Sequence, residues 1–141
     1  MSDNLSTDAR NFNWLIDNFV DTTTGVTDTV AVSSDGLLVA MSRSLDRESA
    51  EQVAAIVTGF VSLGQSTSRC FNFEGLEQVI VRLKQGYLFV SAISDGSCLG
   101  VVANKSCDIG LVGYQTALLV ERAGKVLTPS LIHELRSAVL T

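Results

Sequence analysis

The chain has few of the histidine and cysteine side chains that bind transition metals, and their spacing does not form a binding set. The single histidine is His133, and the three cysteines are Cys70, Cys98 and Cys107. Zinc sites usually bring ligands together in close pairs such as C-x2-C, and the sequence has no such pair. We therefore expect no bound metal, and three reduced thiols in place of a disulfide framework.

Three glycine- or lysine-containing fragments resemble nucleotide-binding motifs but lack what these motifs require. Gly110 and Gly113 fall inside a helical pattern, whereas a dinucleotide fingerprint joins a strand to a helix. The segment 104–107 is similar to the guanine-reading motif of GTPases, but Cys107 stands where that motif has an aspartate. Gly124 precedes a lysine without the second glycine of a phosphate loop. We expect no nucleotide, no other cofactor and no enzymatic activity of the chain's own.

The composition favours a protein that binds other proteins. The chain has 141 residues and a formal net charge of −5, so it lacks the basic excess that nucleic acids and anionic membranes attract. Charged residues make up 18% of the chain, against about 25% in an average domain, which suggests that apolar surface meets another chain. No apolar run approaches the roughly 20 residues of a membrane span, and no signal-peptide pattern opens the sequence, so we expect a cytoplasmic protein.

The hydrophobic pattern predicts helices that alternate with antiparallel hairpins. We expect residues 1–7 to be disordered and residues 8–141 to form one domain. Tight turns at Asp35-Gly36, Gln85-Gly86 and Asp95-Gly96 join apolar runs, which is the strongest short-range hairpin signal. The predicted strands are 30–34, 37–42, 78–83, 87–93 and 98–103. The first predicted helix begins near Asp8, and the other three cover about 48–64, 108–123 and 130–140. Ser44 or Asp46 should cap the second helix, and Ser106 or Asp108 the third.

This order, α-β-β-α-β-β-β-α with a short terminal helix, indicates an α/β (α+β) fold with a five-stranded antiparallel sheet. The run 88–93 is apolar on both sides, as expected for a strand that is covered on both faces. Helices should therefore pack on both faces of the sheet. The helix at 108–123 is apolar almost all round, which predicts that the first and terminal helices enclose it.

The helix at 48–64 has more apolar surface than one sheet contact requires. Two neighbouring stripes together cover about half of its circumference, at 100° per residue. One stripe contains Val53, Ile56, Phe60 and Leu63, and the other contains Ala50, Ala54, Val57 and Val61. The excess predicts either a deeply buried helix or a face for self-association. We expect Ile56 and Phe60 to contact the sheet, and the second stripe to pair with another copy.

Five segments, in this order and spacing, resemble actinobacterial Roadblock/LC7 proteins. They are Asn13–Val20, Ala31–Ala40, Gly86–Val90, Asp95–Val101 and Ala117–Pro129, and the resemblance extends over about residues 12–135. It implies the same profilin-like fold. It also implies a homodimer that pairs through the second helix and third strand into a ten-stranded sheet. With that pairing, the expected dimer interface is Ala50, Ala54, Val57, Val61, Val79 and Val81.

The resemblance further implies a partner, because family members accompany small Ras-like GTPases as activators, scaffolds or regulators. Actinobacterial members also accompany a sensor histidine kinase. The remaining face of the helix at 48–64 is small and weakly polar, so a partner backbone could approach it closely. The expected partner-binding residues are Glu51, Ala55, Thr58, Gly59 and Ser62. An alternative function is small-molecule sensing, since profilin-, PAS- and GAF-like domains share helix-flanked antiparallel sheets.

Overall fold

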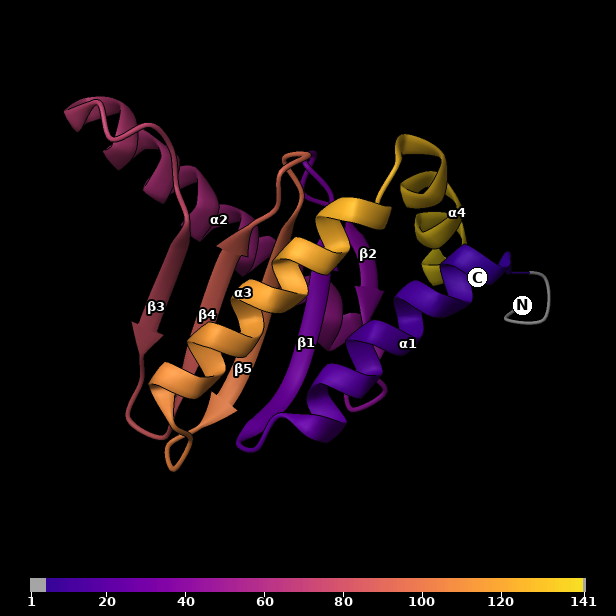
Figure 1. Ribbon diagram of the computed structural model, residues 1–141, viewed down its shortest axis with the longest axis horizontal. Coiled ribbons are helices and arrows are strands. Elements are labelled where there is room, and N and C mark those ends of the chain that lie inside the picture. Colours follow the sequence, from indigo (N-terminus) through magenta and orange to yellow (C-terminus); the bar gives the residue numbers. More distant parts are fainter. Residues whose placement is uncertain (1–4, 141) are drawn as a thin grey trace.

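The computed structural model describes residues 5–140, and within them an antiparallel sheet of five strands lies between layers of helices (Figure 1). The predicted fold is therefore confirmed. In chain order the elements are α1 (Thr7–Thr22), β1 (Val26–Val32), β2 (Leu38–Met41), α2 (Arg47–Phe71), β3 (Gln78–Arg82), β4 (Gly86–Ala92), β5 (Cys98–Asn104), α3 (Ile109–Val126) and α4 (Pro129–Leu140).

The strands pair in the order β2-β1-β5-β4-β3, so β2 and β3 are the two edges of the sheet. Every neighbouring pair is antiparallel. The turns between β1 and β2 and between β4 and β5 contain Gly36 and Gly96, with φ angles of +84° and +92°. Glycine adopts this left-handed conformation without a steric penalty, which is why the Asp-Gly pairs marked these hairpins correctly in the sequence.

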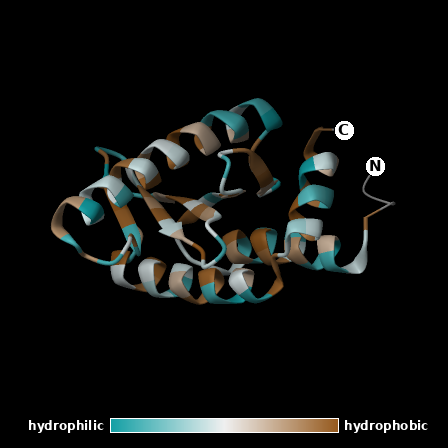
Figure 2. Ribbon diagram, turned by 90° about the horizontal axis from the view of Figure 1, so that it is seen from above, coloured by the Kyte–Doolittle hydropathy of each residue, from teal (hydrophilic) through white to brown (hydrophobic). Residues whose placement is uncertain are grey.

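Two apolar cores lie on opposite faces of the sheet. On one face, α1 and α3 pack against the strands through a cluster that includes Phe12, Phe89 and Leu119. On the other face, α2 covers a second cluster that includes Val30 and Val90. Seen from above, the sheet lies between these layers, and α4 stands at one side of the molecule (Figure 2).

Helix α4 covers the β2 edge of the sheet. It packs against β2 and α1, and it buries Leu131 and Leu135. Glu134 accepts hydrogen bonds from both the backbone N–H and the hydroxyl of Ser6, each at 2.7 Å. Two residues further along α4, Arg136 forms an ion pair with Asp35 of the β1–β2 turn at 3.1 Å. The β2 edge is thereby shielded from pairing with another strand.

Several helix ends differ from the sequence-based prediction. Helix α1 begins at Thr7, and Ser6 caps it by accepting from the Ala9 N–H, so residues 5–7 are ordered by a helix cap. The rest of the segment that we expected to be disordered, residues 1–4, lies outside the described residues. Helix α2 continues to Phe71, because no residue between 65 and 71 interrupts a helix. Asp46 and Asp108 are the caps of α2 and α3.

The prediction that α3 is enclosed is wrong. Leu111 is 43% exposed and Tyr114 is 62% exposed, while Val112, Thr116 and Leu119 face the sheet and are buried. Helix α4 packs mainly against β2 and α1, at the far edge of the sheet from β3. The outer face of α3 is therefore left uncovered along its first half.

Candidate interaction surface

Helix α2 lies against the sheet through small and β-branched side chains. Ala50, Ala54 and Val57 are at most 2% exposed and pack in the second core. The approach is closest at Gly100 of β5, where an added Cβ would lie 2.5 Å from Cγ2 of Val57. Glycine at this position lets the helix pack close to the strand, and that closeness fixes which side of α2 faces inward.

This packing corrects the expected dimer interface. Ala50, Ala54 and Val57 are buried in the chain's own core, so they have no surface to offer to a second copy. Val61, Val79 and Val81 lie at the border of the same core and are half-buried. The two apolar stripes of α2 are adjacent, and helical periodicity alone does not tell which of them faces the sheet.

The other stripe, expected to touch the sheet, is instead the exposed flank of α2. Ile56 is 50% exposed and Leu63 is 67% exposed, while Val53 and Phe60 are half-buried at its inner border. These four residues, which we call the α2 seam, follow steps of three, four and three residues. Such spacing presents an apolar line that a second helix can pack against, as the a and d positions of coiled coils do.

The α2 seam lies in an uncharged stretch of its helix. From Gln52 to Ser68 the sequence contains no Asp, Glu, Lys or Arg, although much of this span is exposed. The nearest charged side chains are Glu51 at one end and Arg69 at the other. An exposed apolar face that lacks charge over more than four helical turns is typical of a surface that binds another protein.

The expected partner-binding residues lie together on the outer side of α2, with one exception. Glu51, Ala55, Gly59 and Ser62 are all exposed. Thr58 is half-buried and turns toward the β1–β2 turn, where its Cγ2 and hydroxyl oxygen lie within 3.4 Å of a Cβ built on Gly36. Its hydroxyl donates to the carbonyl of Ala54 at 2.8 Å, which satisfies that group within the helix.

The β3 edge lies next to this apolar surface, with Ile80 directed to the opposite face of the sheet, like its partner Phe89. Within the described chain β3 pairs with β4 on one side and with no strand on the other. Ile80 and Leu83 are 47% and 54% exposed there. The resemblance pointed to this strand through Val79 and Val81, but the sequence analysis did not identify Ile80 and Leu83, because it considered only alternate residues of the strand. The alternation of apolar and polar residues predicts the faces of a strand but not its neighbours.

Helix α2 also extends past the β3 edge (Figure 1). Its 25 residues make a helix about 37 Å long. The sheet of the described residues has five strands, so its two edge strands are only about 19 Å apart. Beyond the edge, the rings of Phe71 and Phe73 stack with centroids 5.5 Å apart, and both are more than 60% exposed. The Phe-Asn-Phe sequence at 71–73 indicates these exposed rings at the end of α2, and sequence analysis did not use it.

The groups that could do chemistry are scattered. Within residues 5–140, no three His, Cys, Asp or Glu side chains gather as a metal site would require. Cys98 lies under α2, and burial, together with the nearby charge of Asp95, raises the pKa of its thiol to about 11. No helix among the described residues has the length and apolar character needed to cross a bilayer.

The comparison with known families now decides the identity of the fold. Residues 12–103 match the model of the Roadblock/LC7 domain. The chain belongs to the Roadblock/LC7 family. The resemblance noted in the sequence is therefore confirmed. No curated protein matches the chain.

Three solved structures illustrate the family and its fold. The Roadblock/LC7 domain of Streptomyces avermitilis is 36% identical with a TM-score of 0.74, and the match covers 79% of this chain and 92% of that one. MglB of Myxococcus xanthus is 13% identical with a TM-score of 0.75, over 86% and 91% of the two chains. LokiProfilin1 from its complex with rabbit actin is 10% identical with a TM-score of 0.59, over 84% and 97%. The last two likenesses concern the fold alone.

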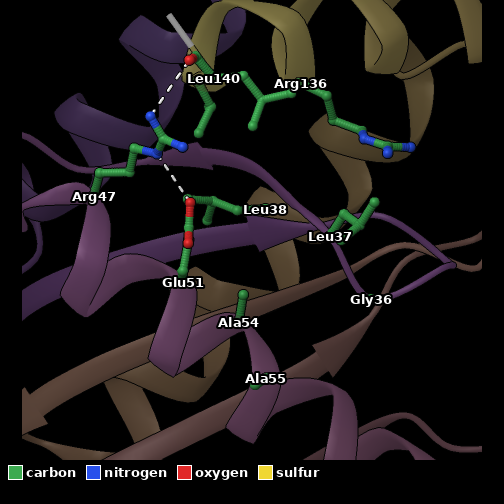
Figure 3. A pocket seen from close by; sticks show the side chains of 10 residues that line it. Gly36, Leu37, Leu38, Arg47, Glu51, Ala54, Ala55, Arg136 and Leu140 are labelled. Carbon is green, nitrogen blue, oxygen red and sulfur yellow. Dashed lines mark hydrogen bonds and ion pairs between the residues drawn. The ribbon is translucent and has the colours of Figure 1, made fainter.

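This Roadblock/LC7 protein has a further feature, which the matched residues form together with α4 from outside the matched range. Helix α4 meets the first turns of α2 and the β1–β2 turn, and a cleft of about 470 Å³ lies between them (Figure 3). Leu38 and Ala54 form its buried wall, and Arg47 and Arg136 lie at its rim. The cleft adjoins the outer side of α2 through Glu51 and Ala55.

Proposed function

We propose that this protein is a non-catalytic regulator or scaffold that pairs with a second copy and binds a small Ras-like GTPase. The observation that carries the proposal is the exposed, uncharged α2 seam beside the open β3 edge. A homodimer would cover both features at once. We expect its interface to exceed about 1,200 Å² in total, the lower range for specific complexes.

The geometry of the pairing follows from the β3 edge. If two copies join their β3 strands antiparallel, a twofold axis perpendicular to the sheet relates them, and the two α2 helices run antiparallel on the same face. Each seam then faces the other. Gln52, Gly59 and Ser66, which flank the seam, are uncharged, so the two α2 helices bring no like charges together along the seam. The proposed interface comprises Val53, Ile56, Phe60, Leu63, Val61, Val79, Val81, Ile80 and Leu83.

The GTPase would bind on the outer side of the paired α2 helices. Ala55, Gly59 and Ser62 supply small exposed side chains there, with Glu51 and Thr58 at the border. Small side chains lose little conformational entropy when a partner orders them. Family membership supports this class of partner, since Roadblock/LC7 proteins accompany small GTPases. The protein would then act in the cytoplasm, in a bacterial signalling system that includes a sensor histidine kinase.

A binding measurement with charge-insertion variants tests the partner site. Biolayer interferometry with the organism's small Ras-like GTPases, loaded with GDP or a GTP analogue, should detect wild-type binding in at least one nucleotide state. Ala55→Arg and Ser62→Arg should weaken that binding at least tenfold while light scattering still shows the dimer. Ala117→Arg, an exposed alanine on α3, is the matched control and should leave binding unchanged. Equal binding by all four proteins would refute the proposed site.

Small-molecule sensing is the second candidate function, and one observation favours it. The cleft beside α4 is mostly apolar and has charged groups at its rim, which is the usual composition of a ligand pocket. The α2 seam does not line the cleft, whereas Glu51 and Ala55 of the proposed GTPase site do, so the two roles would share these two residues.

A further inference from the structure

The cleft between α2, α4 and the β1–β2 turn has an apolar interior. Leu38 and Ala54 are 7% and 2% exposed, and Val139 of α4 packs against the same core. Leu37 and Leu140 stand at the mouth, where they are 47% and 66% exposed. Figure 3 shows Leu37, Leu38, Ala54 and Leu140 around one opening. An alkyl chain in this space would contact apolar groups from three separate elements.

The polar groups of the cleft supply more donors than acceptors. The guanidinium of Arg47 donates from Nε to Glu51 at 2.9 Å and from Nη1 to the Leu140 carbonyl at 3.4 Å. Arg136 donates from Nη1 to Asp35 at 3.1 Å. Each guanidinium has five N–H donors, so most of them make no hydrogen bond within the described protein. An acceptor with two oxygens, such as a carboxylate, matches this arrangement.

Arg47 is the better placed of the two arginines to hold such a group. It lies in the first turn of α2, where the helix dipole also favours an anion. Its bond to Leu140 is long, and it would exchange readily for a charge-assisted bond of about 2.8 Å to a carboxylate. Figure 3 shows its guanidinium between the first turn of α2 and the end of α4, above the apolar wall.

We propose that this cleft binds a small amphipathic anion, a medium-length acyl chain with a carboxylate head. The head pairs with Arg47, and the chain lies along Leu38, Ala54 and Val139. The neighbouring Glu51 competes with the head for the Arg47 guanidinium and lowers the affinity. The site depends on α4, which lies outside the residues that define the family, and it depends on neither the dimer nor the GTPase.

Titration of the protein with decanoate, followed by NMR of the methyl groups, tests the site. Decanoate below its micelle concentration should give saturable shifts at Leu38, Val139 and Leu140. Arg47→Gln should weaken binding at least fivefold, whereas Glu51→Gln should strengthen it at least twofold. Arg82→Gln, an exposed arginine on β3, is the matched control and should leave the affinity unchanged. Decanol, which has the same chain and no charge, should bind at least fivefold more weakly.

The opposite signs of the Arg47 and Glu51 variants separate the proposal from general adhesion to apolar surface. Shifts that appear mainly at Ile56 and Leu63 would overturn it, because the chain would then bind the α2 seam. Equal affinities for decanoate and decanol, or for Arg47→Gln and Arg82→Gln, would also overturn it. If Arg47→Gln does not fold, the Glu51→Gln and decanol measurements still decide, and the absence of any saturable shift in the wild type refutes the site.

Discussion

The three cysteines of this protein differ in environment more than the sequence indicates. Cys70 is exposed in the last turn of α2, while Cys98 is 3% exposed beneath the same helix. Burial raises the pKa of the Cys98 thiol to about 11, and the half-buried Cys107 also has a raised pKa, for the same reason. Thiolates are the reactive form of cysteine, so these differences determine which position reagents can modify.

We predict that a thiol reagent modifies the native protein at Cys70 first. At pH 8 the thiolate fraction of Cys98 is roughly a hundredfold or more below that of an ordinary thiol, and its burial slows access further. Absorbance with Ellman's reagent should show one rapid equivalent that Cys70→Ser removes. Cys98→Ser should leave that rapid phase intact. A rapid phase that survives in Cys70→Ser would contradict the assignment.

At the scale of elements, sequence patterns located helices, strands and turns well but not their relative orientation. The caps at Asp46 and Asp108 follow from local hydrogen bonding, which neighbouring residues determine. Which stripe of α2 faces inward depends on Gly100, which is 43 positions along the chain from Val57, and no local pattern contains that contact. The exposure of Leu63 and Ile80 likewise depends on the order of the strands in the sheet.

We predict that the contact between α2 and β5 is energetically coupled. Gly100→Ala places a methyl group 2.5 Å from the Val57 side chain and 3.2 Å from Val30, and should destabilise the fold by about 1–3 kcal/mol. Val57→Ala leaves a cavity and should cost about 2–3 kcal/mol. The double variant should be more stable than the sum of these losses, because each change relieves the other. Strict additivity in urea unfolding would show that the two side chains do not compete for the same space.

Helix α4 should respond to pH through Glu134. Hydrogen bonds from the Ser6 backbone N–H, and then from its hydroxyl, lower the pKa of this carboxyl. Because the folded pKa lies below the unfolded one, the stabilisation is complete above about pH 5 and is lost as the pH falls through the folded pKa. Amide exchange in α4, corrected for intrinsic rates, should therefore show less protection at pH 3.5 than at pH 6. In Glu134→Gln this difference should shrink, and an undiminished difference would assign the effect to other groups.

At the scale of the whole molecule, the two sheet edges are unequal. Helix α4 and its contacts with Ser6 and Asp35 cover β2, whereas β3 is open and lies beside the uncharged α2 seam. Association of copies through their sheets would therefore use β3. The sequence predicted self-association from the wide apolar face of the helix at 48–64 and the low charged fraction, and only the family resemblance pointed to the third strand. That β2 is covered could not be predicted, since it depends on where α4 packs.

This inequality leads to a prediction that separates the seam from the core of α2. Leu63→Glu puts a charge on the exposed seam. In the dimer each glutamate would be buried against the apolar seam of the other copy, so this variant should give a folded monomer. Ala54→Arg puts a charge into the core between α2 and the sheet, where it has no partner. This variant should therefore unfold the protein instead of releasing folded monomers. Leu111→Glu, on the exposed side of α3, is the matched control and should stay dimeric. Light scattering at tens of micromolar gives the mass of each variant, and circular dichroism gives its fold.

The melting temperature of the wild type should also rise with protein concentration, because dimerisation stabilises only the folded chain, and that of Leu63→Glu should not. A wild-type protein that is monomeric at this concentration, or a dimeric Leu63→Glu, would remove the seam from the interface.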